Sequence, residues 1–125
     1  MDIKLPHILY VEDEAINALI MKKLLPKTYE LSIAHDALSA LKILETVPIC
    51  LVLMDINLGN HQEEGVELMH RIRQNPAWQK IPVLALTSYT EPAQQQRFLS
   101  LGFEAYLKKP VVMEELLQHF QRLLI

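Results

Sequence analysis

Acidic residues follow two short apolar runs of the chain, at the positions where strands would end. Glu12 and Asp13 follow the run 7–11, and Asp55 follows the run 50–54. Residues just past the ends of parallel strands converge at the carboxyl edge of an open α/β sheet, where ligands bind. We therefore expect these three carboxylates to lie close together, provided that both runs are strands of one parallel sheet.

Two later runs bring a hydroxyl group and an ammonium group to the same edge. Thr87 follows the run 82–86, and Lys109 follows the run 105–107 after one intervening residue, Lys108. The predicted site therefore combines three carboxylates with one hydroxyl and one ammonium group.

The charges of this predicted site do not balance. Three ionised carboxylates and one ammonium leave it with two net negative charges, so either a carboxylate takes up a proton or a divalent cation binds. An all-oxygen ligand set favours Mg²⁺, with Mn²⁺ possible, over zinc. Because Mg²⁺ in proteins is commonly shared between one or two carboxylates and phosphate oxygens, the site predicts phosphoryl chemistry with an aspartate as nucleophile.

The elements that must position these groups alternate along the chain. Two of the apolar runs are continuously apolar, as expected for central strands buried on both faces of a parallel sheet. Alternation of such runs with stretches of helical period predicts βαβ units, and therefore an α/β fold. The expected strands are 7–11, 30–34, 50–54, 82–86 and 105–107, and the expected helices are 15–25, 37–45, 65–75, 92–101 and 112–124.

Length and composition narrow the classes of protein. A chain of 125 residues, half of them hydrophobic, is sized as a single globular domain. A net charge of -3, without a basic run, predicts no direct nucleic acid ligand. The apolar runs are too short to span a membrane, and the one cysteine, Cys50, is expected to be a buried hydrophobe. We expect a cytoplasmic protein.

Four short motifs, in this order and spacing, resemble the receiver domain of two-component response regulators. The resemblance covers essentially the whole chain, 1–125, and implies a single receiver domain without an effector domain. It also implies a flavodoxin-like, doubly wound, five-stranded parallel sheet of strand order 2-1-3-4-5 with five helices. The motifs are Val11-Glu12-Asp13, Leu53-Met54-Asp55, Leu86-Thr87-Ser88 and Tyr106-Leu107-Lys108-Lys109-Pro110.

The resemblance implies a phosphoacceptor and a metal site. Asp55 would take a phosphoryl group from a phosphohistidine donor in a Mg²⁺-dependent reaction of phosphorelay signal transduction. Glu12, Asp13 and Asp55 would hold the ion, and the main-chain carbonyl of Asn57 would add a ligand. The domain would then be a regulatory phosphoprotein that catalyses only its own phosphorylation and dephosphorylation, and not an enzyme acting on a separate substrate.

The resemblance also implies a conformational switch. Lys109 would pair with the phosphoryl oxygens, and Thr87 would donate its hydroxyl group to them. Tyr106 would be the aromatic residue that turns inward when Thr87 moves, and the bond before Pro110 would be cis. The loop 59–64, beyond Asp55, is longer than is typical of the family, and its role is open.

Partner surfaces are expected on two parts of the chain. The first helix carries more apolar residues than one buried face needs, which is typical of a partner surface. In the family it is where a histidine kinase or histidine phosphotransfer domain docks. A downstream protein target would bind the face formed by the fourth helix, the fifth strand and the fifth helix.

The sequence leaves other functions open beside this interpretation. The start of the first helix, with Asn17, also resembles receivers attached to hybrid histidine kinases, so a receiver excised from such a kinase or from a phosphorelay protein is an alternative. A Mg²⁺-dependent aspartyl-phosphate phosphatase is a second alternative, of another class. That family places an Asp-x-Asp pair after its first strand, where this chain has Asp13-Glu14-Ala15. A receiver-like module that binds partners without phosphorylation is a third.

Overall fold

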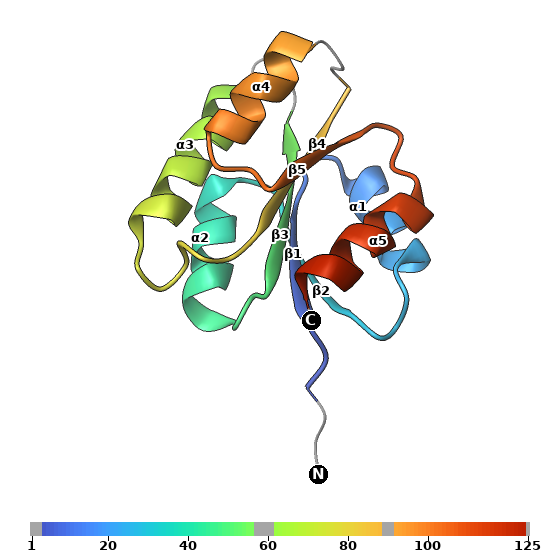
Figure 1. Ribbon diagram of the computed structural model, residues 1–125. Coiled ribbons are helices and arrows are strands. Elements are labelled where there is room, and N and C mark those ends of the chain that lie inside the picture. Colours follow the sequence, from blue (N-terminus) through green and yellow to red (C-terminus); the bar gives the residue numbers. More distant parts are fainter. Residues whose placement is uncertain (1–3, 57–61, 89–91, 125) are drawn as a thin grey trace.

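The five strands form one parallel sheet in the order β2-β1-β3-β4-β5. The computed structural model describes residues 4–56, 62–88 and 92–124. The predicted α/β fold with strand order 2-1-3-4-5 is confirmed (Figure 1). The strands are β1 (His7–Val11), β2 (Glu30–Ala34), β3 (Leu51–Ile56), β4 (Val83–Thr87) and β5 (Ala105–Lys108).

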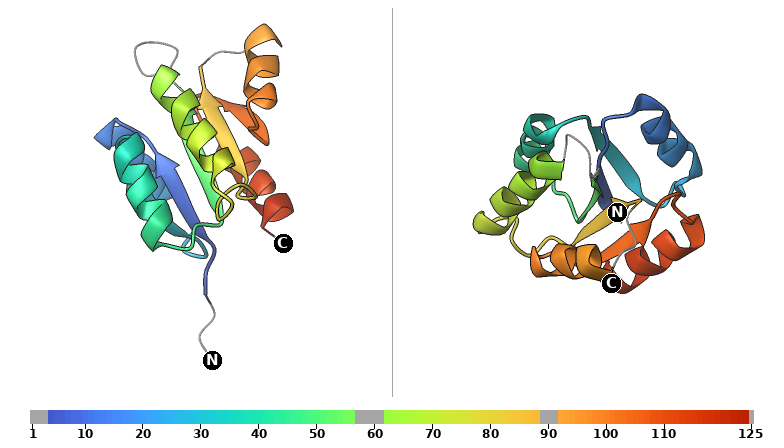
Figure 2. Two further views of the ribbon diagram at one scale, coloured as in Figure 1. Left: turned by 90° about the vertical axis from the view of Figure 1, so that its left-hand side faces the viewer. Right: turned by 90° about the horizontal axis from the view of Figure 1, so that it is seen from above.

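Helices cover both faces of the sheet, which gives three layers (Figures 1 and 2). The helices α1 and α5 lie on one face, and α2, α3 and α4 lie on the other. Among the residues that the structure describes, no helix is long and apolar enough to cross a membrane. The helices are α1 (Ala15–Leu24), α2 (Ala37–Thr46), α3 (Gln62–Gln74), α4 (Pro92–Ser100) and α5 (Met113–Leu123).

Two apolar cores hold the layers together, one on each face of the sheet. All five residues of β4 are buried, as are five of the six residues of β3. Successive side chains of a strand point to opposite faces, so Leu53 joins the core under α1 and α5, whereas Met54 joins the core under α2, α3 and α4. The central position predicted for these two strands is confirmed.

One prediction about the third strand was wrong by two residues. The strand does not end before Asp55 but continues to Ile56, and Asp55 is paired in register with Leu86 of β4. Parallel pairing with β4 therefore extends past the apolar run. As a result, the carboxylate of Asp55 projects from the last part of a strand and not from a loop.

The prediction that Cys50 is buried was also wrong. Cys50 is exposed and directly precedes β3 at the amino end of the sheet. Its backbone N–H donates to the carbonyl oxygen of His7 at 2.9 Å, which satisfies the backbone without burying the thiol. An apolar run thus predicted the strand correctly but extended one residue beyond the buried part.

Candidate functional site

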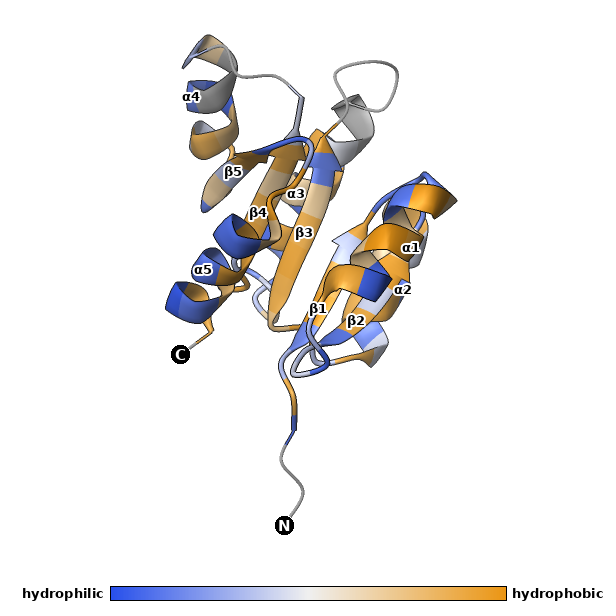
Figure 3. Ribbon diagram, turned by 90° about the vertical axis from the view of Figure 1, so that its right-hand side faces the viewer, coloured by the Kyte–Doolittle hydropathy of each residue, from blue (hydrophilic) through white to orange (hydrophobic). Residues whose placement is uncertain are grey.

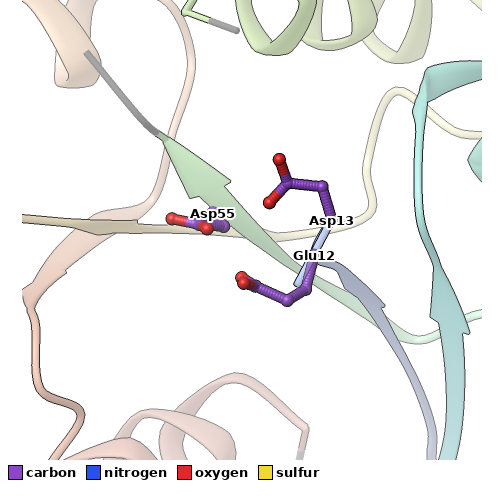
Figure 4. Close-up of side chains that lie close together, drawn as sticks. All are labelled: Glu12, Asp13 and Asp55. Carbon is purple, nitrogen blue, oxygen red and sulfur yellow. The ribbon is translucent and has the colours of Figure 1, made fainter. Parts of the chain in front are cut away.

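Three carboxylates meet at the carboxyl edge of the sheet, as predicted. One oxygen from each of Glu12, Asp13 and Asp55 lies within 4.8 Å of the other two (Figure 4). Glu12 and Asp13 directly follow β1, and Asp55 comes from the neighbouring strand β3. The three differ in burial: Glu12 is buried, the side chain of Asp55 is 7% exposed, and Asp13 is exposed.

Lys109 supplies the positive charge of the site. Its ammonium group forms an ion pair with Oδ1 of Asp55, which is buried. The backbone N–H of Lys109 donates to the carbonyl oxygen of Thr87 at 2.9 Å, which ties the chain after β5 to the end of β4. The peptide bond from Lys109 to Pro110 is cis, as expected.

Glu12 is held by two neutral donors. Nδ2 of Asn17 donates to Oε1 of Glu12 at 2.9 Å, and the hydroxyl group of Tyr10 donates to Oε2 at 3.3 Å. Burial, together with a hydrogen bond to Asp55, raises the pKa of Glu12 to about 7. Burial and the charge of Glu12 also raise the pKa of Tyr10, so its phenol stays protonated and donates.

Tyr10 and Asn17 were not predicted as parts of the site. Two signals in the sequence point to them in retrospect. Tyr10 precedes Glu12 by two residues, which places both side chains on one face of the sheet. Asn17 lies in the first turn of α1, directly after the acidic residues. Neither signal says which of the many polar groups near a strand end will reach Glu12.

Thr87 and Tyr106 lie on the face of the sheet covered by α2, α3 and α4. Thr87 is the last residue of β4 and is fully buried. Tyr106, in β5, is half-buried and packs against the core on that face. Tyr106 is in register with Ala85, two residues before Thr87, so the two predicted switch residues are diagonal neighbours on one face of the sheet.

The remaining predicted ligand lies outside the described part of the chain. That ligand is the main-chain carbonyl of Asn57. Residues 59–61, part of the loop whose role is open, also lie outside the described residues. Beside the carboxylates the structure has a cavity of about 150 Å³. Its lining includes Glu12, Asp13, Asp55 and the small residue Gly65 at the start of α3.

The donor set fits a hard divalent cation. All three carboxylates offer oxygen, and with Lys109 charged they leave an excess of negative charge that such an ion would balance. The ion pair joins the buried Oδ1 of Asp55 to the half-buried Lys109, and so places a cation and a carboxylate together at the edge of the sheet. This is the combination needed to bind a group bearing negatively charged oxygens next to a nucleophilic carboxylate.

Comparison with known proteins points to one family. The family model described as the response regulator receiver domain matches residues 8–121. A probable cyclic di-GMP phosphodiesterase of Vibrio cholerae is 36% identical over 83% of this chain and 23% of its own length. The sensor histidine kinase RcsC of Salmonella typhi is 35% identical over 89% of this chain and 11% of its own length. The chain thus spans less than a quarter of these two relatives.

Solved structures of the same kind superpose on it. The chemotaxis protein CheY4 of Vibrio cholerae matches with a TM-score of 0.82 and 26% identity, covering 96% of this chain and 99% of that one. The Mn²⁺-bound form of response regulator Rcp1 matches with a TM-score of 0.68 and 30% identity, covering 94% and 90%. The family match extends over both acidic segments and Lys109, and the sheet order is the one expected. The chain therefore belongs to the response regulator receiver domain family.

Proposed function

We propose that this receiver domain accepts a phosphoryl group on Asp55 from a phosphohistidine donor. A carboxylate oxygen of Asp55 would attack phosphorus in line, the P–N bond to histidine would break, and the imidazole would keep that electron pair and take up a proton. The observation that carries the proposal is the ion pair of Asp55 with Lys109 beside two further carboxylates. Phosphoryl transfer of this kind depends mainly on positioning and charge neutralisation.

The proposal includes a divalent cation, Mg²⁺ or Mn²⁺. Glu12, Asp13 and Asp55 would hold it through side-chain oxygens, with the main-chain carbonyl of Asn57 as a further ligand. When bound, the ion would supply charge neutralisation for the phosphoryl oxygens. The Mn²⁺-bound form of the similar regulator Rcp1 supports this part of the proposal.

Lys109, Thr87 and Tyr106 would couple phosphorylation to a change of surface. Lys109 would move its ion pair from Asp55 to the phosphoryl group, and the Thr87 hydroxyl would donate to that group. Thr87 is buried at the end of β4, so its movement would leave space on the face where Tyr106 packs. Tyr106 would then turn inward.

The phosphodonor would dock on α1. Four large apolar residues of this helix are exposed, and Figure 3 shows hydrophobic residues over its outer side. Next to them is a pocket of about 420 Å³ between α1 and the start of α5, which reaches Lys109. A helix of a histidine kinase or histidine phosphotransfer domain could fill it within reach of the site. The exposed residues are Ile16, Leu19, Ile20 and Leu24.

A downstream target would bind the face formed by α4, β5 and α5. Leu99 of α4 and Val112, which precedes α5, are exposed there. Tyr106 lies in β5, between the two helices in sequence, so its rotation would alter this face. The interaction is the output of the switch in this proposal.

The domain would act as a regulatory module in the cytoplasm and not as an enzyme with a separate substrate. It would be either a single-domain regulator or the receiver part of a hybrid kinase or phosphorelay protein. The match to sensor histidine kinases is what supports the second form. A phosphatase with an aspartyl-phosphate intermediate is less well supported, because the residue two positions after Asp13 is Ala15.

Transfer from a protein donor tests the proposal. A histidine phosphotransfer domain labelled with ³²P on its histidine is mixed with the wild-type chain, Asp55→Asn and Asp36→Asn, each with Mg²⁺ and with EDTA. We expect label on the wild type and on Asp36→Asn with Mg²⁺ only, and none on Asp55→Asn. Equal labelling of Asp55→Asn would contradict the assignment of the phosphoacceptor.

A further inference from the structure

The carboxylate of Glu12 accepts one hydrogen bond on each oxygen, from two different elements. Tyr10, in β1, donates to Oε2, and Asn17, in α1, donates to Oε1. Asn17 also donates to Oε2 of Glu14 at 3.3 Å, so its amide is held from two sides. Glu12 is therefore held by groups from two different elements, one in the sheet and one in a helix.

A glutamate in a divalent cation site needs such constraint. Its side chain has three rotatable bonds, whereas Mg²⁺ requires near-ideal octahedral geometry. Glu12 is 1% exposed, so its carboxylate cannot rely on solvent to hold it. Figure 4 shows it directed toward Asp55. The hydrogen bonds from Tyr10 and Asn17 hold it in this orientation.

The chemical type of the two donors matters as much as their positions. A phenol and an amide orient a carboxylate without neutralising it, whereas a lysine or arginine at either position would compete with a bound cation. Each carboxylate oxygen has about two lone-pair sites and accepts one of these hydrogen bonds, so capacity for a metal ion or its water remains. The pair thus holds Glu12 and leaves the negative charge of the site intact.

We propose that Tyr10 and Asn17 are positioning residues that fix Glu12 as a ligand for the divalent cation. This inference rests on the proposed function, because it needs the carboxylate cluster to bind such an ion. Asn17 is delivered by α1, so the seating of this helix on the sheet sets the orientation of Glu12. Tyr10 and Asn17 also line the pocket between α1 and α5.

Titration with Mn²⁺ tests the proposal, with the free ion measured by electron paramagnetic resonance and Mg²⁺ added as competitor. The variants are Tyr10→Phe and Asn17→Ala, and each has a matched control. Tyr29→Phe removes a hydroxyl group from a tyrosine whose ring packs on Phe120, and Ile16→Ala truncates an exposed neighbour in α1. Loss of a residue that orients a metal ligand typically weakens metal binding about 10- to 100-fold. We expect weakening of at least about tenfold for the two variants, with the controls close to the wild type.

A double-mutant cycle separates positioning from a structural role. If Asn17 acts through Glu12, Asn17→Ala has no further effect on Mn²⁺ affinity in a Glu12→Ala background. An effect of the same size in that background would overturn the proposal, as would wild-type affinity in both single variants, whatever their thermal stability.

The outcomes also distinguish this inference from the proposed function. No Mn²⁺ binding by the wild type would overturn both. Weakened binding by the two variants, together with no phosphorylation of the wild type, would support the positioning role and contradict the phosphoacceptor role.

Discussion

The ammonium group of Lys109 pairs with the carboxylate of Asp55 across the carboxyl edge of the sheet, from the chain after β5 to β3, with β4 between them. This contact joins residues 54 positions apart in the sequence and depends on the order of the strands. It places a cation on the residue proposed as nucleophile.

Replacement of Lys109 should slow phosphorylation. Lys109→Met removes the cation that pairs with the carboxylate of Asp55. Loss of one preorganised charged donor commonly lowers a reaction rate by about 10²-fold or more. The rate of adduct formation with acetyl phosphate and Mg²⁺ measures the effect, and Lys108→Met, at the exposed neighbouring position, serves as control. Equal rates for both variants would contradict the role of Lys109.

The docking surface on α1 should matter for a protein donor and not for a small one. Leu19→Glu places a charge in the exposed apolar surface, where Leu19 is 51% exposed. We expect phosphotransfer from a histidine phosphotransfer domain to fall at least tenfold, with the reaction with acetyl phosphate unchanged. Leu38→Glu, at a 64% exposed position in α2, is the control. If Leu38→Glu lowered transfer equally, the donor would not be using α1.

Arg73 should be important for stability although it lies far from the acidic site. Its Nη1 donates to the carbonyl oxygens of Gln79 and Ile81, both at 2.9 Å, and its Nη2 donates to that of Gly102 at 2.8 Å. Arg73 therefore ties α3 to the segment before β4 and to the turn after α4. Gly102 has a φ of 102° and a Cβ there would lie 3.1 Å from Nε of Arg73, so this turn suits glycine.

Removing this guanidinium should destabilise the fold. Arg73→Met leaves three carbonyl oxygens without their charged donor, and we expect the free energy of unfolding to fall by about 2 to 3 kcal/mol. Arg71→Met, in the same helix, removes only an exposed pair with Glu67 at 3.7 Å, and should cost less than about 1 kcal/mol. Urea unfolding measures both. Similar losses of unfolding free energy for the two variants would show that the hydrogen bonds of Arg73 to the three carbonyl oxygens add no more stability than an exposed ion pair.

The start of α2 should show a pH dependence that can be removed without losing the helix cap. Oδ1 of Asp36 accepts from the backbone N–H of Ser39 at 2.8 Å and from its hydroxyl at 2.7 Å. These hydrogen bonds lower the pKa of Asp36 below its ordinary value of 3.8. A lowered pKa in the folded state stabilises the protein above that ordinary value, and the contribution disappears as the pH falls through the lowered pKa.

Asp36→Asn tests this because asparagine also caps helices but does not titrate. We expect the difference in Tm between the wild type and Asp36→Asn to be constant above about pH 5 and to shrink toward pH 2 to 3. Glu45→Gln, in the last turn of the same helix, controls for the loss of one carboxylate. A difference that stays constant down to pH 2 would show that the charge of Asp36 contributes nothing to the cap.

The fold was predictable because its signal lies in single segments of the sequence. Continuous apolar runs indicate buried parallel strands, and their alternation with helical stretches leaves few topologies. The residues that follow those runs could also be identified from the sequence. Because the carboxyl ends of parallel strands meet at one edge of the sheet, the sequence predicts that Glu12, Asp13, Asp55 and Lys109 lie together.

Other features depend on contacts that no single segment contains. The hydrogen bond of Asn17 to Glu12 depends on how α1 is seated on the sheet, and the extension of β3 through Asp55 depends on pairing with β4. Cys50 was predicted to be buried but is exposed, because an apolar run does not mark the residue at which burial begins. The roles of Thr87 and Tyr106 remain predictions, since switching compares two states of the domain.

The most direct test of Asp55 as the phosphoacceptor is the intact mass of the protein after incubation with acetyl phosphate. The wild type and Asp55→Asn are compared, each with Mg²⁺ and with EDTA. We expect a single phosphoryl adduct on the wild type that requires Mg²⁺ and is absent from Asp55→Asn. No adduct on the wild type under any condition, with no binding of Mg²⁺, would contradict this expectation and would favour a module that binds partners without phosphorylation.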